Sequence, residues 1–200
     1  CRQLAQALKS ASQRLGARYF LQHVVRALNP GTRPGVLVMP ASGGSVPGAA
    51  PQEFDGVVVC AAADSADLLR PLGIRLPWQA IHSCSVTAPL RDGDDADRHL
   101  PRGILLDPDR HVIVSRLGQR VRVAGRARPG PPRQTPSSSD VAPLYAALDA
   151  WFPGAARQAR AQAWAGAQPA FADALPALGP SGVPGIWLNL GHGSSGWALS

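Results

Sequence analysis

The residues whose types and spacing best suit chemistry lie at 191–196, where the sequence reads Gly-His-Gly-Ser-Ser-Gly. This glycine loop follows the apolar run 185–190, which is typical of a buried strand. Glycines directly after a strand let backbone N–H groups approach an anion or a ring closely, and a following helix adds positive potential. The letters fit G-x-G-x-x-G, but one match of that kind is weak, and a tight turn is the alternative.

Cysteine and histidine, the common metal ligands, are scattered along the chain. No C-x-x-C, H-x-x-x-H or H-E-x-x-H spacing occurs, so we expect no metal site. An odd number of cysteines without paired spacing also favours a reducing compartment. The residues concerned are Cys1, Cys60, Cys84, His23, His82, His99, His111 and His192.

The charge of the chain argues against nucleic acid as a partner. The formal net charge is +7, and Lys9 is the one lysine among 20 basic residues. The arginines are spread along the sequence, whereas a nucleic-acid binder gathers them on one element with aromatic residues between. No apolar run reaches the roughly 20 residues of a membrane span, and no secretory signal pattern precedes the first helix.

The first part of the chain predicts helix–strand units. Leu4 to Leu15 show helical spacing, and Gly16 is suited to end that helix. Strands are predicted at 19–28, at 36–41 and at 57–61. The last of these has no polar alternation and runs into a helix, which is typical of a strand buried on both faces of a parallel sheet.

The second part predicts a mixed, mainly antiparallel region. Residues 80–90 alternate as a strand does, and 103–125 read as successive strands with turns at Pro108–Asp109 and Gly118–Gln119. Asp140 is suited to cap a helix over 141–152. The predicted fold class is therefore α/β with an α+β insertion, in two lobes interleaved along the sequence.

Several of these segments together resemble the FAD-dependent D-amino-acid oxidase superfamily, and most of all its bacterial D-amino-acid dehydrogenases. The glycine loop and the strand before it match the carboxy-terminal signature of that family. Residues 1–28, "FDGVVVCAAADSADLL", "IHSCSVTAPL" and "SRLGQRVRVAG" match further segments in family order. A longer pattern, W-x-G-x-R-P-x-x-P-D-x-x-P-x-x-G, is matched at Trp164, Gly166, Pro169, Asp173, Pro176 and Gly179.

The resemblance implies FAD as cofactor and a division into three ranges. Residues 1–75 and 166–200 would belong to an FAD-binding lobe, and 76–165 to an antiparallel substrate lobe. The amino-terminal dinucleotide fingerprint of the family is absent from these residues, so we expect a carboxy-terminal fragment that binds FAD poorly when alone. The cofactor-binding residues implied are Val25, Ala61, Ala62, Gly191, His192, Gly193, Ser194, Ser195, Gly196 and Trp197.

The resemblance also implies substrate-binding positions, and there this sequence departs from the family. Gln168 stands where the family has a carboxylate-binding arginine, and Cys84 where it has a tyrosine. His82 lies on the same predicted strand and is the third substrate-binding candidate. Ala62 stands where the family has glycine. No side chain is singled out as a certain catalytic residue.

The activity implied is oxidative deamination of D-amino acids, with hydride passing from substrate Cα to flavin N5. The products would be a 2-oxo acid and ammonia. Three alternatives stay open: a related amine, glycine or sarcosine-type oxidase with altered recognition, a catalytically impaired relative, and a binding module that reuses the lobe. A membrane quinone is the electron acceptor implied, and the expected location is the cytoplasm or the inner face of its membrane.

Overall fold

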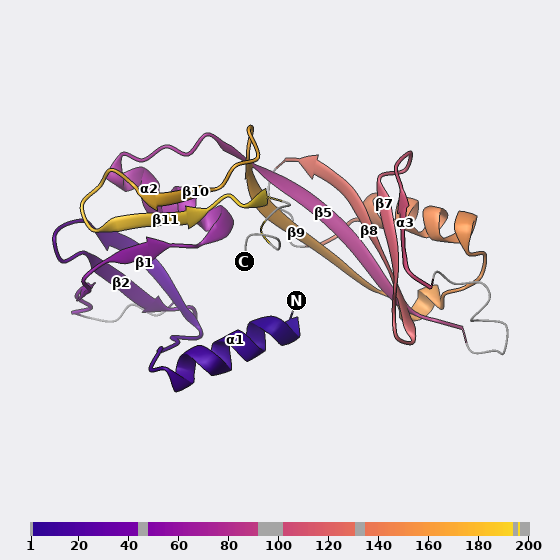
Figure 1. Cartoon of the computed structure of the whole chain (residues 1–200), viewed down its shortest axis with the longest axis horizontal. Coiled ribbons are helices and arrows are strands. Elements are labelled where there is room, and N and C mark those ends of the chain that lie inside the picture. Colours follow the sequence, from indigo (N-terminus) through magenta and orange to yellow (C-terminus); the bar gives the residue numbers. More distant parts are fainter. Residues whose placement is uncertain (1, 44–47, 92–101, 131–134, 194–195, 197–200) are drawn as a thin grey trace. The chain divides into compact units, whose positions relative to one another are not determined.

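The computed structural model describes residues 2–43, 48–91, 102–130, 135–193 and 196, which form two units (Figure 1). The first unit comprises residues 1–59, 66–75 and 179–188. The second comprises residues 60–65, 76–178 and 189–200. The chain is of mixed α/β class, and each unit has its own sheets.

The first unit begins with the predicted helix, α1 (Arg2–Arg14), and Gly16 follows it with a left-handed φ of 94°. β1 (His23–Asn29) pairs antiparallel with β2 (Gly35–Pro40), and β3 (Gln52–Glu53) adds to β2. The strand predicted over 19–28 was placed four residues too early. Gln22 has a φ of 58°, which breaks an extended chain, and the Tyr19 hydroxyl instead makes a 2.6 Å hydrogen bond with Ser12 of α1.

A short parallel pair confirms only part of the prediction for 57–61. β4 (Val57–Val59) pairs in parallel with β11 (Ile186–Leu190), and β10 (Ala177–Pro180) lies on the other side of β11. The strand ends two residues earlier than predicted, because Ala62 takes a φ of 46° at the start of the 3₁₀ helix η1 (Ala62–Asp64). Val58 is 58% exposed, so the expectation of burial on both faces is wrong for this strand.

Two short helices follow η1 along the chain. α2 spans Ser65–Leu69 and the 3₁₀ helix η2 spans Arg70–Leu72. Leu69 is fully buried, and Gly73, with a φ of 79°, closes the segment. The helix predicted after this strand is therefore present.

The second unit contains a five-stranded antiparallel sheet in the order β6-β7-β8-β5-β9. Its strands are β5 (Trp78–Pro89), β6 (Ile104–Asp107), β7 (Val112–Leu117), β8 (Arg120–Pro129) and β9 (Gln162–Phe171). Both turns predicted between 103 and 125 are confirmed. The sequence reading missed β9, whose glycine, proline and small residues lack the alternation that marks a strand.

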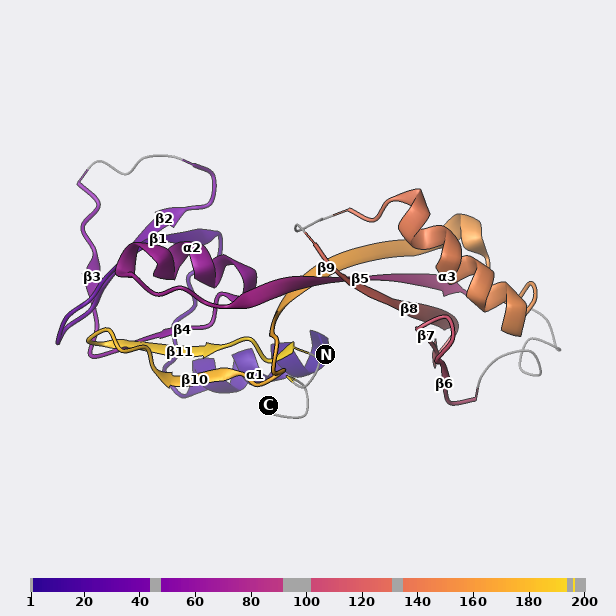
Figure 2. The ribbon, with the colours of Figure 1, turned by 90° about the horizontal axis from the view of Figure 1, so that it is seen from above.

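One helix, α3 (Ser138–Trp151), packs on one face of this sheet (Figure 2). Its N-cap is Ser137 and not the predicted Asp140, which instead occupies the third helical position and completes a capping box. The core between helix and sheet comprises Cys84, Val86, Ala88, Leu90, Val112, Val114, Val121, Val123, Leu144, Ala147, Leu148 and Ala156. The 3₁₀ helix η3 (Gln158–Arg160) then leads into β9.

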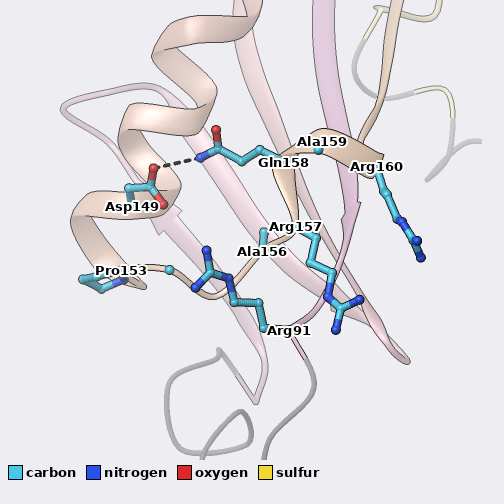
Figure 3. A pocket seen from close by; sticks show the side chains of 9 residues that line it. Arg91, Asp149, Pro153, Ala156, Arg157, Gln158, Ala159 and Arg160 are labelled. Carbon is cyan, nitrogen blue, oxygen red and sulfur yellow. Dashed lines mark hydrogen bonds between the residues drawn. The ribbon is translucent and has the colours of Figure 1, made fainter.

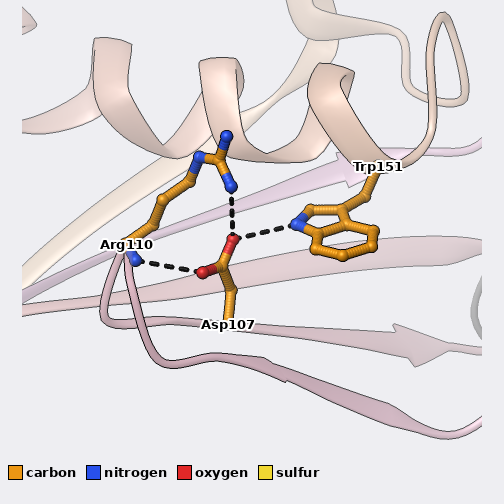
Figure 4. Close-up of polar contacts among 3 residues, drawn as sticks. All are labelled: Asp107, Arg110 and Trp151. Carbon is orange, nitrogen blue, oxygen red and sulfur yellow. Dashed lines mark hydrogen bonds and ion pairs between the residues drawn. The ribbon is translucent and has the colours of Figure 1, made fainter.

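A buried carboxylate ties the far end of α3 to the β6–β7 turn (Figure 4). Asp107 is 3% exposed and accepts hydrogen bonds from Trp151 Nε1 at 2.9 Å and from the Arg110 backbone N–H at 3.0 Å. Arg110 Nη1 donates a third at 2.9 Å. These donors, the indole first, lower the pKa of Asp107 to about 2.

Candidate active site

A pocket of about 190 Å³ in the second unit brings together residues that lie far apart in the sequence. Ala62 comes from η1, Gln168 from β9, and the glycine loop follows β11. The complete lining is Cys60, Ala62, Gln168, Pro169, Asn189, Leu190, Gly191, His192 and Gly193. Five of the residues singled out from the sequence therefore share one pocket.

The glycine loop lies against the end of β9. His192 forms an isolated antiparallel bridge with Ala170. Gly191 has a φ of 75°, and a Cβ built on it would overlap the ring of Phe171. Gly193 also has a positive φ, of 53°, but a Cβ there would lie 3.7 Å from the Cβ of Ala170, an ordinary contact. Gly191 is therefore required both by its backbone conformation and by the close approach of the aromatic ring.

The η1 side of the pocket contains the one alanine that the family resemblance marked as a glycine position. Ala62 has a φ of 46°, in the left-handed region that favours glycine. The preceding Ala61 is half-buried, and its carbonyl accepts the Asp64 backbone N–H at 3.0 Å. The backbone at Ala62 therefore has a conformation that glycine would adopt more readily.

The lining of the pocket carries no fixed charge. None of its nine residues is an aspartate, glutamate, lysine or arginine. Gln168 supplies a neutral amide, and the ionisable side chains are those of Cys60 and His192. A carboxylate in this pocket would thus meet the neutral amide of Gln168 and backbone N–H groups as hydrogen-bond donors.

The structure places the other two substrate-binding candidates on the opposite face of the sheet from Gln168. Gln168 pairs with Ile81 of β5 and shares its face of the sheet. His82 and Cys84 lie at even-numbered positions of β5, so their side chains point to the other face, which α3 covers. Cys84 is 7% exposed, and burial, with the Asp140 charge adding to it, raises the pKa of its thiol. His82 Nε2 donates to the Gly130 carbonyl at 2.5 Å, and its Nδ1 is buried without a partner.

Of the remaining candidates, Val25 is in the first unit, Gly196 is in the second, and three lie outside the described residues. Val25 is half-buried on β1 of the first unit, where the pairing with β2 contains an irregularity between Val25 and Ala27. Gly196 lies in a turn. Ser194, Ser195 and Trp197 lie outside the described residues.

Sequence reasoning missed four residues of the lining: Cys60, Pro169, Asn189 and Leu190. Each of them lies beside a predicted site residue or in the strand before the glycine loop. The feature that could have identified them is therefore their position at the end of a strand or next to Gln168. Strand ends that converge on one pocket cannot be recognised from the sequence until the pairing of the strands is known.

A second pocket, of about 740 Å³, lies at the opposite end of β5 and contains none of the predicted site residues (Figure 3). Leu90, just after β5, bridges to Ala156 there, and the Asp149 carboxylate accepts a 2.9 Å hydrogen bond from Gln158 Nε2. Its lining is Arg91, Asp149, Pro153, Gly154, Ala156, Arg157, Gln158, Ala159 and Arg160. Within the part of the chain that the structure describes, no group of three acidic, histidine or cysteine residues could hold a metal ion.

Comparison with known proteins gives a consistent family. Residues 1–200 match the family model described as "FAD dependent oxidoreductase" (DAO). A D-amino acid dehydrogenase of Rhodopseudomonas palustris is 31% identical over 206 residues, which cover 100% of this chain and 44% of that protein. One from Cereibacter sphaeroides is 35% identical over 146 residues, covering 73% of this chain and 33% of that protein. The chain thus spans less than half the length of these relatives.

Solved structures show the same fold at lower sequence identity. Glycine oxidase from Geobacillus kaustophilus superposes with a TM-score of 0.75 at 18% identity, covering 94% of this chain and 48% of that one. L-proline dehydrogenase from P. horikoshii gives a TM-score of 0.70 at 14% identity, with 94% and 48% covered. In the described ranges, no helix is both long and apolar enough to cross a membrane.

Proposed function

Because this chain belongs to the family of FAD-dependent oxidoreductases, we propose that its protein oxidises D-amino acids at Cα to imino acids, which water hydrolyses to a 2-oxo acid and ammonia. The observation that carries the proposal is the pocket that joins Gln168 to the glycine loop. It brings the position implied for substrate recognition next to the segment implied for the cofactor.

The lining of the pocket fits a flat, uncharged ring. Ala62, Gly191 and Gly193, which line the pocket, have small side chains or none and leave its volume to a ligand. Neither a bulky charged group nor a metal-ligand set occupies that space. FAD would accept the hydride from the substrate Cα, which carries both electrons of the oxidation. We assign Ala61, Ala62 and residues 191–193 to it, with Val25 for its adenine and Ser194, Ser195, Gly196 and Trp197 as further contacts.

The side chains of this chain would bind and orient the substrate and need not remove a proton. Gln168 can donate hydrogen bonds to the substrate carboxylate through its amide. It lacks the charge and the planar fork of an arginine, which weakens that contact by roughly 1–2 kcal/mol, on the order of tenfold in affinity. If the substrate amine binds neutral, no general base is required, in keeping with a lining whose ionisable groups are Cys60 and His192.

An altered substrate is the second candidate, and the uncharged lining favours it. A neutral amide suits a substrate without an α-carboxylate, such as an amine. A small amino acid such as glycine or sarcosine, which keeps the carboxylate, is the other altered substrate, and one of the structural neighbours is named a glycine oxidase. A catalytically impaired relative is the third. We assign residues 1–75 and 166–200 to cofactor binding and 76–165 to the substrate. A membrane quinone remains the electron acceptor we propose, which would bring the protein to the inner face of the cytoplasmic membrane.

The test uses the protein in its full natural length. D-amino acids, glycine, sarcosine and simple amines are added without oxygen, and the visible flavin absorbance is recorded. Bleaching by D-amino acids supports the proposal. We expect Gln168→Arg to raise kcat/KM for D-alanine by on the order of tenfold. If only amines bleach the flavin, the second candidate replaces the first, and if flavin is bound but nothing bleaches it in either variant, the proposed activity is refuted.

A further inference from the structure

Two arginines lie side by side on the open face of the five-stranded sheet. The open face is the face of the sheet that lies opposite α3. It carries the β5 residues Ile81, Ser83, Ser85 and Thr87. Arg120 pairs with Pro89 and Arg122 pairs with Thr87, so both project from the open face. They stand two residues apart on β8.

The hydrogen bonds of these arginines leave their charges unneutralised. Arg122 Nη2 donates to Ser85 Oγ at 3.0 Å, and Arg120 Nη2 donates to the Thr87 carbonyl at 3.1 Å and to Gln162 Oε1 at 3.3 Å. All three acceptors are neutral. The ion pairs found among the described residues, at Arg33, Arg70 and Arg110, involve neither arginine.

A buried donor on Arg120 has no partner. Its Nε is shielded from solvent and makes no hydrogen bond. A guanidinium offers five N–H groups, and a desolvated donor without an acceptor costs free energy. Two adjacent positive charges on one face add to that cost. An oxyanion bound between them would remove both costs, because it supplies acceptors and negative charge together.

An exposed indole lies between these arginines and the pocket of Gln168. Trp164 is the strand partner of Ser85 and is 56% exposed. Its ring lies over Gly166, since a Cβ on that glycine would overlap the indole. Gln168, two residues further, is paired with Ile81. Ser85 is four positions after Ile81 along β5, a span of about 13 Å.

We propose that Arg120 and Arg122 bind an anionic group at the far end of the substrate's side chain, whose middle part lies on the Trp164 indole. The substrate is then a long D-amino acid with a terminal carboxylate. The identity of the ligand as an amino acid rests on the proposed function. The arginines supply, on the face that Gln168 shares, the positive charge that its own pocket lacks.

The test compares two substrates of nearly equal shape. O-carboxymethyl-D-tyrosine carries a terminal carboxylate, and O-ethyl-D-tyrosine ends in a neutral group of similar size. We expect the first to bind the full-length protein at least tenfold more tightly by calorimetry, with the same preference in kcat/KM. In Arg122→Gln the ratio should fall close to one, and Arg122→Lys should retain part of it because the charge remains.

Arg128→Gln is the matched control, since Arg128 lies on the same strand but pairs with His82, whose side chain is on the other face. Arg128→Gln should keep the full preference for the compound with the terminal carboxylate. Thermal unfolding of each variant checks that it is folded. The proposal is overturned if the wild type does not distinguish the two compounds, or if Arg122→Gln preserves the distinction. Calorimetry measures binding of the two compounds and needs no turnover. If no amino acid bleaches the flavin, that result refutes the proposed function and leaves the binding comparison to decide the anion site.

Discussion

Gly191 offers the sharpest test of how the glycine loop is held against β9. In Gly191→Ala the new methyl group meets two penalties that the structure separates. The φ of 75° places an alanine in the left-handed region, which costs about 1–2 kcal/mol. The methyl also overlaps the ring of Phe171, and overpacking of this kind costs roughly 1–3 kcal/mol. The free energy of unfolding should therefore fall by about 2–5 kcal/mol in total.

Gly193→Ala separates the two penalties. Its φ of 53° brings the same backbone cost, but the nearest atom to its Cβ is an ordinary 3.7 Å away. Urea unfolding of both variants should show Gly191→Ala to be less stable by roughly 1–3 kcal/mol. Adding Phe171→Ala should make most of that difference disappear, because the overlapping ring is gone. Equal destabilisation by the two glycine variants would refute the role we give to Phe171.

Two further perturbations test other parts of the structure. The pKa of Asp107 is about 2 when folded and ordinarily 3.8, so its stabilising contribution is present above pH 3.8 and is lost as the pH falls toward 2. Urea unfolding of wild type and Asp107→Asn across that range should converge, and a gap that stays constant with pH would contradict the network in Figure 4. Ala62→Gly relieves a left-handed alanine, so we expect unfolding stability between unchanged and about 1 kcal/mol higher. A clear loss of stability would show that Ala62 is not strained.

The antiparallel region was the part of the fold most accessible to sequence reasoning. The turns at Pro108–Asp109 and Gly118–Gln119 carry local signals, since proline, aspartate and glycine restrict or free the backbone where they stand. β9 carries no such signal: Gly166 and Pro169 read as loop residues, and the segment is a strand because β5 provides a partner along its whole length. In β9 the pairing with β5 therefore outweighs the local sequence preference for a loop.

The candidate site, too, could be predicted from the sequence only in part. The glycine loop and Gln168 could be singled out because their residue types are unusual at those positions. The faces of β5 could not, because a shift of one residue exchanges the two sides of a strand. Ile81 lies with Gln168 and His82 lies away from it, and only the register of β5 with β9 decides which is which. Arg120 and Arg122 likewise emerge as a pair only when the sheet is assembled.

The strand pair β4–β11 has a consequence for how the protein is made. It joins Val57–Val59 to Ile186–Leu188. The first unit therefore contains residues that come before and residues that come after the long segment 76–178 of the second unit. During synthesis the ribosome releases all of the second unit's sheet before β11 emerges. The second unit can therefore fold on its own hairpins before β11 is available to pair with β4. Until then the edge of β4 that pairs with β11 lacks that partner, and a valine-rich strand edge of this kind is prone to wrong pairing.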